Sequence, residues 1–304
     1  IYFSRGSDPE IYNERKELGK LLCPKVLETI NYDLQNTVFS YIPNTAETSF
    51  LGMMHGVEDH LIQKRQEVLE KGKLKELEKM LSFKPRVEKL VIKDAKLRTF
   101  ITEDEQRDDL VAHVYDTTYE VINKKKDTLV VIDDSIVRGT TLEKSILRML
   151  DTLEPKKIII VSSAPQIRYP DCYGIDMSRM QDFIAFRALL ELLEDTDQSH
   201  LLKEAHKRCK KAKKENALHE KNHLREVYKQ FSTEQISNKI AQIIGAGINA
   251  EVQVVYQSIS NLHKACPNHL GDWYFTGKYP TPGGNKVVNR AFMNFMEGKD
   301  GRAY

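Results

Sequence analysis

Short apolar runs alternate with longer amphipathic stretches along this chain, a pattern typical of α/β proteins. Apolar runs predict strands at residues 37–42, 87–93, 129–132 and 157–165. The run at 129–132 contains no polar residue, as expected of a strand buried on both faces of a parallel sheet. Helical spacing predicts helices at residues 11–31, from about residue 47, and at 61–82, 141–153 and 177–195. We therefore expect a mostly parallel sheet flanked by helices.

The composition is that of a soluble globular protein. The 304 residues are 30% charged and 40% apolar, and the formal net charge of +2 is too small to argue for a polyanionic or membrane partner. No apolar run approaches the roughly 18 residues of a membrane-spanning helix. The four cysteines form no C-x-x-C pair, which favours a reducing compartment. We expect a cytoplasmic protein with no membrane partner.

The stretch "LVVIDDSIVRGTT" at residues 129–141 carries the clearest chemistry. Asp133 and Asp134 follow the apolar run directly, so they should emerge at the carboxyl end of a strand, where open α/β sheets bind ligands. Gly139 permits a tight backbone path before the next helix, and a helix N-terminus offers free N–H groups to an anion. Two carboxylates beside a phosphate cradle predict a site for a phosphorylated sugar.

Four separated segments extend this prediction to a family. They are the loop with its Ser-Ile-Val-Arg filling, "YFSRGSDPEIYNERKELG" at 2–19, "SSAPQIRYPDCYGIDM" at 162–177 and "FTGKYPT" at 275–281. Together they resemble, in order, the glutamine phosphoribosyl-pyrophosphate (PRPP) amidotransferases, which are type I phosphoribosyltransferases. Residues 196–265 match poorly. The resemblance implies a type I phosphoribosyltransferase fold with a PRPP-binding core at 1–195 and a mostly helical, charged extension with a C-terminal wrapping segment at 196–304.

The resemblance also implies residue roles. Asp133 and Asp134 would bind the ribose hydroxyls and help to hold Mg²⁺, because hard carboxylate oxygens suit both. The 5′-phosphate would lie on the loop that follows, formed by Ser135, Ile136, Val137, Arg138, Gly139, Thr140 and Thr141.

A second loop, "IPNTAET", takes the place of the family's pyrophosphate loop. Asn44 and Thr45 would contact the pyrophosphate, and Thr45 would also approach Mg²⁺. Asn44 and Ala46 replace the acid and the glycine that are usual there, so an ordinary turn with a helix cap remains an alternative.

Cationic residues should stabilise the negative charge that grows on departing pyrophosphate. The segment "KDAKLRTFI" at 93–101 resembles the start of the family's flexible loop, which makes Lys93, Arg98 and Arg107 the catalytic candidates. Beyond Arg107 the sequence departs from the family's basic run, and no secure counterpart of its loop lysine follows. Solvent-exposed surface charge is the alternative for each of the three.

The family's glutaminase part is expected to be absent from this chain. It uses an N-terminal cysteine, whereas this chain begins with Ile1 and places Cys23 in a predicted helix. The chain would then form 5-phosphoribosylamine from PRPP and free ammonia, the first step of purine synthesis. Gly271 and Tyr274 stand where some relatives carry cluster cysteines, so we expect no iron–sulfur cluster. The family also suggests a homo-oligomer, the glutaminase domain of a full-length protein as partner, and inhibition by purine nucleotides.

Two other functions remain open. A nucleobase phosphoribosyltransferase would share the PRPP loop, and a non-catalytic PRPP-binding regulator would keep the fold. The regulator's only support is the lysine-rich segment at 203–221. It lies within residues 200–230, which form either a nucleic-acid patch or a solvated helix. The interspersed glutamates favour the solvated helix, so we expect no nucleic-acid partner.

Overall fold

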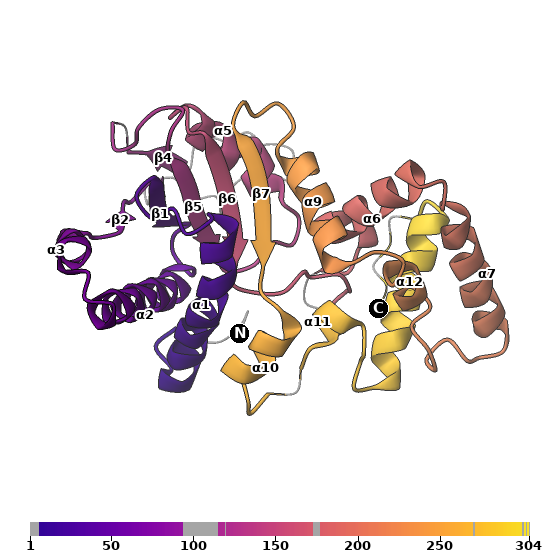
Figure 1. The fold of residues 1–304 in the computed structure, drawn as a ribbon. Coiled ribbons are helices and arrows are strands. Elements are labelled where there is room, and N and C mark those ends of the chain that lie inside the picture. Colours follow the sequence, from indigo (N-terminus) through magenta and orange to yellow (C-terminus); the bar gives the residue numbers. More distant parts are fainter. Residues whose placement is uncertain are drawn as a thin grey trace. The chain divides into compact units, whose positions relative to one another are not determined.

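The computed structural model describes residues 6–93, 115–118, 120–172, 177–269 and 271–299, together with Gly301 and Ala303 (Figure 1). These residues form two compact units. The first unit comprises the described residues of Ile1–Asp134, Thr141–Ala164 and Gly245–Cys266, and the second those of Ser135–Thr140, Pro165–Ile244 and Pro267–Tyr304. Each unit is therefore assembled from segments that are distant in sequence.

A five-stranded parallel sheet forms the centre of the first unit. Its strands, in spatial order, are β2 (Arg86–Val87), β1 (Thr37–Tyr41), β5 (Thr128–Asp133), β6 (Lys157–Ser162) and β7 (Glu251–Tyr256). The predicted mostly parallel sheet is confirmed. However, β7 comes from the region that the sequence assigns to a mostly helical extension, and it was not predicted.

The strand register brings three carboxyl ends to one edge of the sheet. Ile132 of β5 pairs with Tyr41 of β1 on one side and with Val161 of β6 on the other, and Asp133 pairs with Ser162. Residues 129–132 are fully buried, as their unbroken apolar character predicts. The loops that leave β1, β5 and β6 therefore begin side by side.

Helices cover this sheet. The helices of the first unit are α1 (Pro9–Thr29), α2 (Glu47–Glu70), α3 (Leu74–Ser82), α5 (Leu147–Asp151), which continues a π-helical turn (Leu142–Ile146), and α10 (Ile259–Ala265). The Asp8 carboxylate caps α1 by accepting from the N–H groups of Glu10 and Ile11. Apolar side chains of α1 and α2 form one core with alternate residues of the strands; these are Leu22, Val26, Phe50, Met53, Phe39, Val130 and Ile159.

Glycines allow α1 and α2 to pack with their backbones in direct contact. A Cβ atom on Gly19 would lie 1.7 Å from the Ser49 carbonyl oxygen, and one on Gly52 would lie 1.8 Å from the Lys16 carbonyl oxygen. Ser49 Oγ also donates a hydrogen bond of 3.0 Å to the Arg15 carbonyl. No side chain fits between the helices at these positions, so the two helices would have to separate to accept one.

We expect Gly52→Ala to lower the free energy of unfolding by about 1–3 kcal/mol, because the added methyl group overpacks the contact with Lys16. Urea titration followed by circular dichroism measures the change. Gly283→Ala is the control, since a Cβ there would meet only Thr281 Oγ1, at 3.8 Å. Equal stability of the Gly52 variant and the wild type would contradict the close packing.

The predicted strand at 87–93 is interrupted. Only Arg86–Val87 joins the main sheet, whereas β3 (Val91–Lys93) pairs antiparallel with β4 (Tyr115–Thr117) in a separate two-stranded ribbon. Buried Ser40 of β1 fixes the start of this ribbon, because its Oγ accepts from the Leu90 N–H at 3.0 Å.

The second unit is helical in its described residues. Its elements are a 3₁₀ turn (Met180–Asp182) and the helices α6 (Ile184–Asp195), α7 (His200–Lys214), α8 (Arg225–Tyr228), α9 (Thr233–Ile244), α11 (Trp273–Thr276) and α12 (Pro282–Met296). Helix α6 packs on α9, and α7 packs on α12. Buried Asn289 of α12 ties the loop after α7 in place, since its Nδ2 donates to the carbonyls of Leu218 and Lys221 at 2.8 Å each. Across the described parts of the chain, no helix has both the length and the apolar character needed to cross a membrane.

Candidate active site

The acidic pair lies where the sequence predicts it, at the carboxyl end of the central strand β5. Ser163, which follows β6, holds the backbone of both acids: its N–H donates to the Asp133 carbonyl at 2.9 Å, and its Oγ donates to the Asp134 carbonyl at 3.0 Å. The Asp134 N–H donates to Asp133 Oδ1 at 2.8 Å, which orients that carboxylate. The neighbouring strand thus fixes the turn that presents the two carboxylates. Sequence reasoning missed Ser163.

The electrostatics of the pair suit a cation. Burial raises the pKa of Asp133 well above its ordinary value, and the adjacent Asp134 carboxylate raises it further. A divalent cation would neutralise the two carboxylates and so relieve the repulsion between them, and hydrogen-bond donors would stabilise their charge. The donor set of adjacent carboxylate oxygens therefore fits Mg²⁺.

The raised pKa predicts a pH-dependent effect of Asp133→Asn. A carboxyl group that binds its proton more tightly in the folded state makes folding less favourable as the pH rises above the unfolded value of about 3.9. The uncharged amide removes this penalty, so in EDTA the variant should melt at a higher temperature than the wild type at pH 7, with the difference vanishing near pH 4. Thermal melts across this range test the prediction, with exposed Glu58→Gln as control. A lower melting temperature of the Asp133 variant at pH 7 would contradict it.

The second predicted loop leaves the neighbouring strand β1. The Ile42 N–H donates to the Ile132 carbonyl at 2.9 Å, so the beginning of this loop is joined to the end of β5. Asn44 and Thr45 are exposed, and the Pro43–Asn44 peptide bond is cis. Helix α2 begins at Glu47, as predicted. The first unit therefore brings Asp133, Asp134 and the Asn44–Thr45 loop to the same edge of the sheet.

The predicted phosphate loop, Ser135–Thr140, belongs to the second unit, and Thr141 belongs to the first. Within the second unit, the Val137 carbonyl accepts from the Ile184 N–H at 2.8 Å, and Arg138 lies 3.6 Å from the Asp182 carboxylate. Gly139 has φ +73° and packs beside Ile184, so a side chain at Gly139 would be both strained and crowded. The glycine that the sequence singles out thus has a structural requirement.

The predicted cationic residues are described only in part. Lys93 is the last residue of β3, and only its backbone is described. Arg98 and Arg107 lie outside the described residues. Their role in catalysis therefore remains a prediction.

Two further residues of the matched segments lie in the second unit. Arg168 donates to Gln166 Oε1 and stands over the ring of Tyr228 at 5.4 Å, while Tyr169 is buried. The N–H groups of Arg168 and Tyr169 both donate to the Tyr274 carbonyl, at 2.8 and 3.1 Å. Backbone hydrogen bonds thus join the family-like segment at 162–177 to Tyr274, the residue just before the family-like segment at 275–281.

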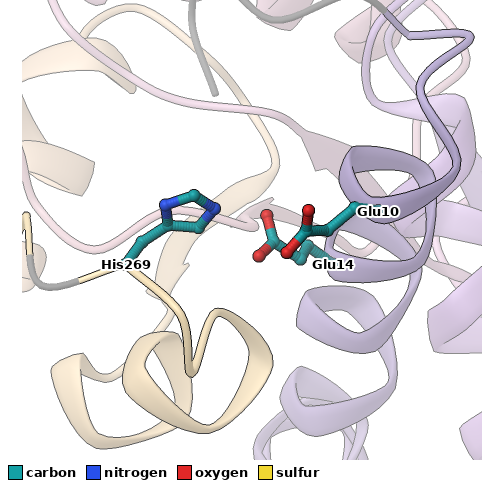
Figure 2. Close-up of side chains that lie close together, drawn as sticks. All are labelled: Glu10, Glu14 and His269. Atoms are coloured by element: carbon teal, nitrogen blue, oxygen red, sulfur yellow. The ribbon is translucent and has the colours of Figure 1, made fainter.

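Two other features within the described residues contain none of the predicted site residues. Figure 2 shows Glu10 and Glu14 one turn apart on α1, with their carboxylates directed to the same side. A cavity of 990 Å³ in the first unit is lined mainly by α1, α2 and the loop after α1. The acidic pair of β5 remains the candidate centre.

The chain is similar in part of its sequence, and in its fold, to proteins that have been described before. No protein-family model matches the chain. The amidophosphoribosyltransferase of Haemophilus influenzae is 48% identical to this chain over 62 residues, which are 20% of this chain and 12% of that protein. The amidophosphoribosyltransferase of Schizosaccharomyces pombe is 25% identical over 194 residues, which are 61% of this chain and 31% of that protein. A solved structure described as the allosteric regulatory enzyme of purine biosynthesis covers 90% of this chain and 44% of its own, with a TM-score of 0.50 and 20% identity.

These relatives extend well beyond the region of similarity, since the matched part is less than a third of the length of either amidophosphoribosyltransferase. The solved structure establishes the fold, and the curated relatives establish the sequence relationship. The chain is therefore similar in sequence to amidophosphoribosyltransferases over part of its length, and the resemblance predicted from its sequence is confirmed.

Proposed function

We propose that this chain is the PRPP-binding transferase part of an amidophosphoribosyltransferase, which forms 5-phosphoribosylamine and pyrophosphate from PRPP and ammonia. The observation that carries the proposal is the acidic pair Asp133–Asp134 at the carboxyl end of the central strand, followed by a Gly-Thr-Thr loop, in a chain related to these enzymes. The reaction breaks the bond between ribose C1 and the pyrophosphate oxygen, forms a bond from C1 to nitrogen, and releases one proton from that nitrogen.

The proposed roles of the residues come from the family resemblance, and the positions of Asp133 and Asp134 at the end of β5 support them. Asp133 and Asp134 accept hydrogen bonds from the ribose hydroxyls and hold Mg²⁺, which when bound neutralises charge on the pyrophosphate. Residues 135–141 hold the 5′-phosphate through backbone N–H groups and hydroxyls. Asn44 and Thr45, which begin from the adjacent strand β1, contact the pyrophosphate, with Thr45 also facing Mg²⁺.

Cations complete the site in this proposal. Lys93, Arg98 and Arg107 stabilise the charge that develops on the leaving group, since electrostatic stabilisation of a departing pyrophosphate requires no covalent chemistry. The transferase core then consists of residues 1–195 together with β7, which completes the sheet.

We further propose that the ammonia comes from a glutaminase domain of a longer protein, that the enzyme is a cytoplasmic homo-oligomer, and that purine nucleotides inhibit it. The reaction would be the first step of purine synthesis. Each of these statements is taken from the resemblance and applies to the whole enzyme.

The test is release of pyrophosphate from PRPP by the purified chain, with Mg²⁺ and ammonium chloride at alkaline pH. We expect release that requires both ammonia and Mg²⁺. Release that requires a purine or pyrimidine base instead would favour a nucleobase phosphoribosyltransferase. Mg²⁺-dependent binding of PRPP without any release would contradict the transferase proposal and favour a PRPP-binding regulator.

A further inference from the structure

Helix α7 carries a concentration of positive charge that the proposed reaction does not use. It lies in the segment, residues 196–265, that the family resemblance covers poorly. Within His200–Lys214 there are seven lysines or arginines and one glutamate, a formal charge of +6, whereas the whole chain carries only +2. The remainder of the chain therefore carries a net negative charge, and the chain's excess of positive charge lies on this helix.

Four of these lysines lie in a row on the exposed face of the helix. Lys203, Lys207, Lys210 and Lys214, called here the lysine stripe, are exposed and follow the spacing i, i+4, i+7, i+11. This spacing keeps them within about 60° of one another around the helix axis and spreads them over about 16 Å of its length. The buried residues Ala205, Cys209 and Ala212 occupy the opposite face.

The opposite face of α7 is held by the second unit. Cys209 Sγ lies 3.6 Å from Asn289 Oδ1 of α12, and the rings of His206 and Phe292 are 6.4 Å apart. Figure 1 shows α7 alongside α12. The rotation of α7 about its axis is therefore fixed, and the lysine stripe points to solvent.

The chain supplies few acidic partners to the stripe. Nearby carboxylates are used elsewhere: Glu204 pairs with Arg208 and Glu215 with Lys211. Within the lysine stripe, Lys210 Nζ lies 3.6 Å from the Glu297 carboxylate. The same carboxylate also pairs with His206 and Lys299. Among the described residues, Lys203, Lys207 and Lys214 form no ion pair.

A solvated surface helix normally interleaves acids with its lysines at i, i+4, which stabilises it. Here Lys203 and Lys207, and likewise Lys210 and Lys214, are like charges at i, i+4, and like charges at this spacing destabilise a helix. The sequence alone favoured a solvated helix, whereas the exposed and largely unpaired lysines of the structure favour a binding surface for an anion. A polyanion that lies along the stripe would remove this repulsion.

We propose that the lysine stripe of α7 binds the phosphate backbone of a nucleic acid without sequence preference. Protein partners are bound chiefly through aromatic, arginine and apolar anchors, and lysine is depleted at such interfaces. The stripe has none of these anchors, whereas phosphate binding needs only cations at regular intervals, and several lysines along one helix provide them. The lysine stripe has no groups that would hydrogen-bond to base edges, so we expect binding that depends on phosphate charge and not on base sequence.

The test is fluorescence anisotropy of the full chain with a labelled 20-base-pair duplex, as DNA and as RNA, across a series of KCl concentrations. We expect binding at low salt. The logarithm of the association constant should fall linearly with the logarithm of the salt concentration. The quadruple variant Lys203→Gln, Lys207→Gln, Lys210→Gln, Lys214→Gln should weaken binding at least tenfold and make the slope shallower by about 3–4, at about 0.9 per lysine.

A matched variant replaces four exposed lysines of the first unit by glutamine, namely Lys71, Lys75, Lys84 and Lys89. It loses the same charge and should retain most of the binding, as should a stripe in which all four lysines become arginine. Circular dichroism of each variant verifies folding. No binding by the wild type, equal losses in the two glutamine variants, or binding of polyglutamate in place of nucleic acid would each overturn the proposal. Pyrophosphate release should be unchanged in the stripe variant, so the two proposals fail independently.

Discussion

The double variant Asp133→Asn, Asp134→Asn should lose at least about 100-fold of ammonia-dependent PRPP turnover. Both substitutions preserve the side-chain shape. They remove the carboxylates that would hold Mg²⁺ and accept hydrogen bonds from the ribose hydroxyls. Because the turn is fixed by Ser163 through backbone carbonyls, the loop geometry should survive the substitutions. Pyrophosphate release under saturating ammonia and Mg²⁺ measures the loss.

The control for this variant is Glu58→Gln, Glu70→Gln, which removes two exposed carboxylates from α2 and should retain wild-type turnover. Titration calorimetry with PRPP separates binding from chemistry, and we expect Mg²⁺-dependent binding to weaken in the Asp variant alone. Full turnover by the Asp133, Asp134 variant would show that the acidic pair has no part in the reaction.

Asp127→Ala should lower the free energy of unfolding by about 2–4 kcal/mol, because it removes the buried carboxylate of a partly buried ion pair and leaves the Asn123 N–H without its acceptor. The Asp127 side chain is fully buried, and its Oδ2 accepts from Arg86 at 2.7 Å and from the Asn123 N–H at 2.6 Å. Arg86 also donates to the Val121 carbonyl. These contacts join edge strand β2 to the turn that precedes β5. Urea unfolding followed by fluorescence and circular dichroism measures the loss.

An exposed ion pair nearby provides the comparison. Lys124→Ala removes the pair with Glu154, in which both side chains are largely solvent-exposed, and should cost less than about 1 kcal/mol. Replacing both partners, as Arg86→Met with Asp127→Leu, should recover much of the loss, because no charge is then left unpaired. A single Asp127 variant as stable as the Lys124 variant would contradict the partly buried pair.

The part of the site nearest the sheet could be predicted because its signals are local. Four apolar residues followed by two acids define both a buried strand and its end, and Gly139 marks the one position where the backbone adopts a positive φ in this loop. The parallel sheet followed from the same alternation of strands and helices. These features depend on neighbouring residues alone.

Features that depend on distant residues were missed. Ser163 becomes important only through the register of β6 against β5, which pairs Ser162 with Asp133. β7 was missed although Glu251–Tyr256 contains three valines and a tyrosine, which favour a strand, because it follows a long helical segment. No local pattern reports either the register of a sheet or the origin of its edge strand.

The strand order also constrains when the first unit can fold. β1 pairs with β5 across about 90 residues, and β6 pairs with β7 across a similar interval that includes most of the second unit. Because parallel pairing between distant segments must overcome a large loss of chain entropy first, such sheets form slowly. During synthesis the edge of β6 stays uncovered until residue 256 has left the ribosome, so the nascent chain exposes an unpaired strand while helices α6 to α9 of the second unit are being made.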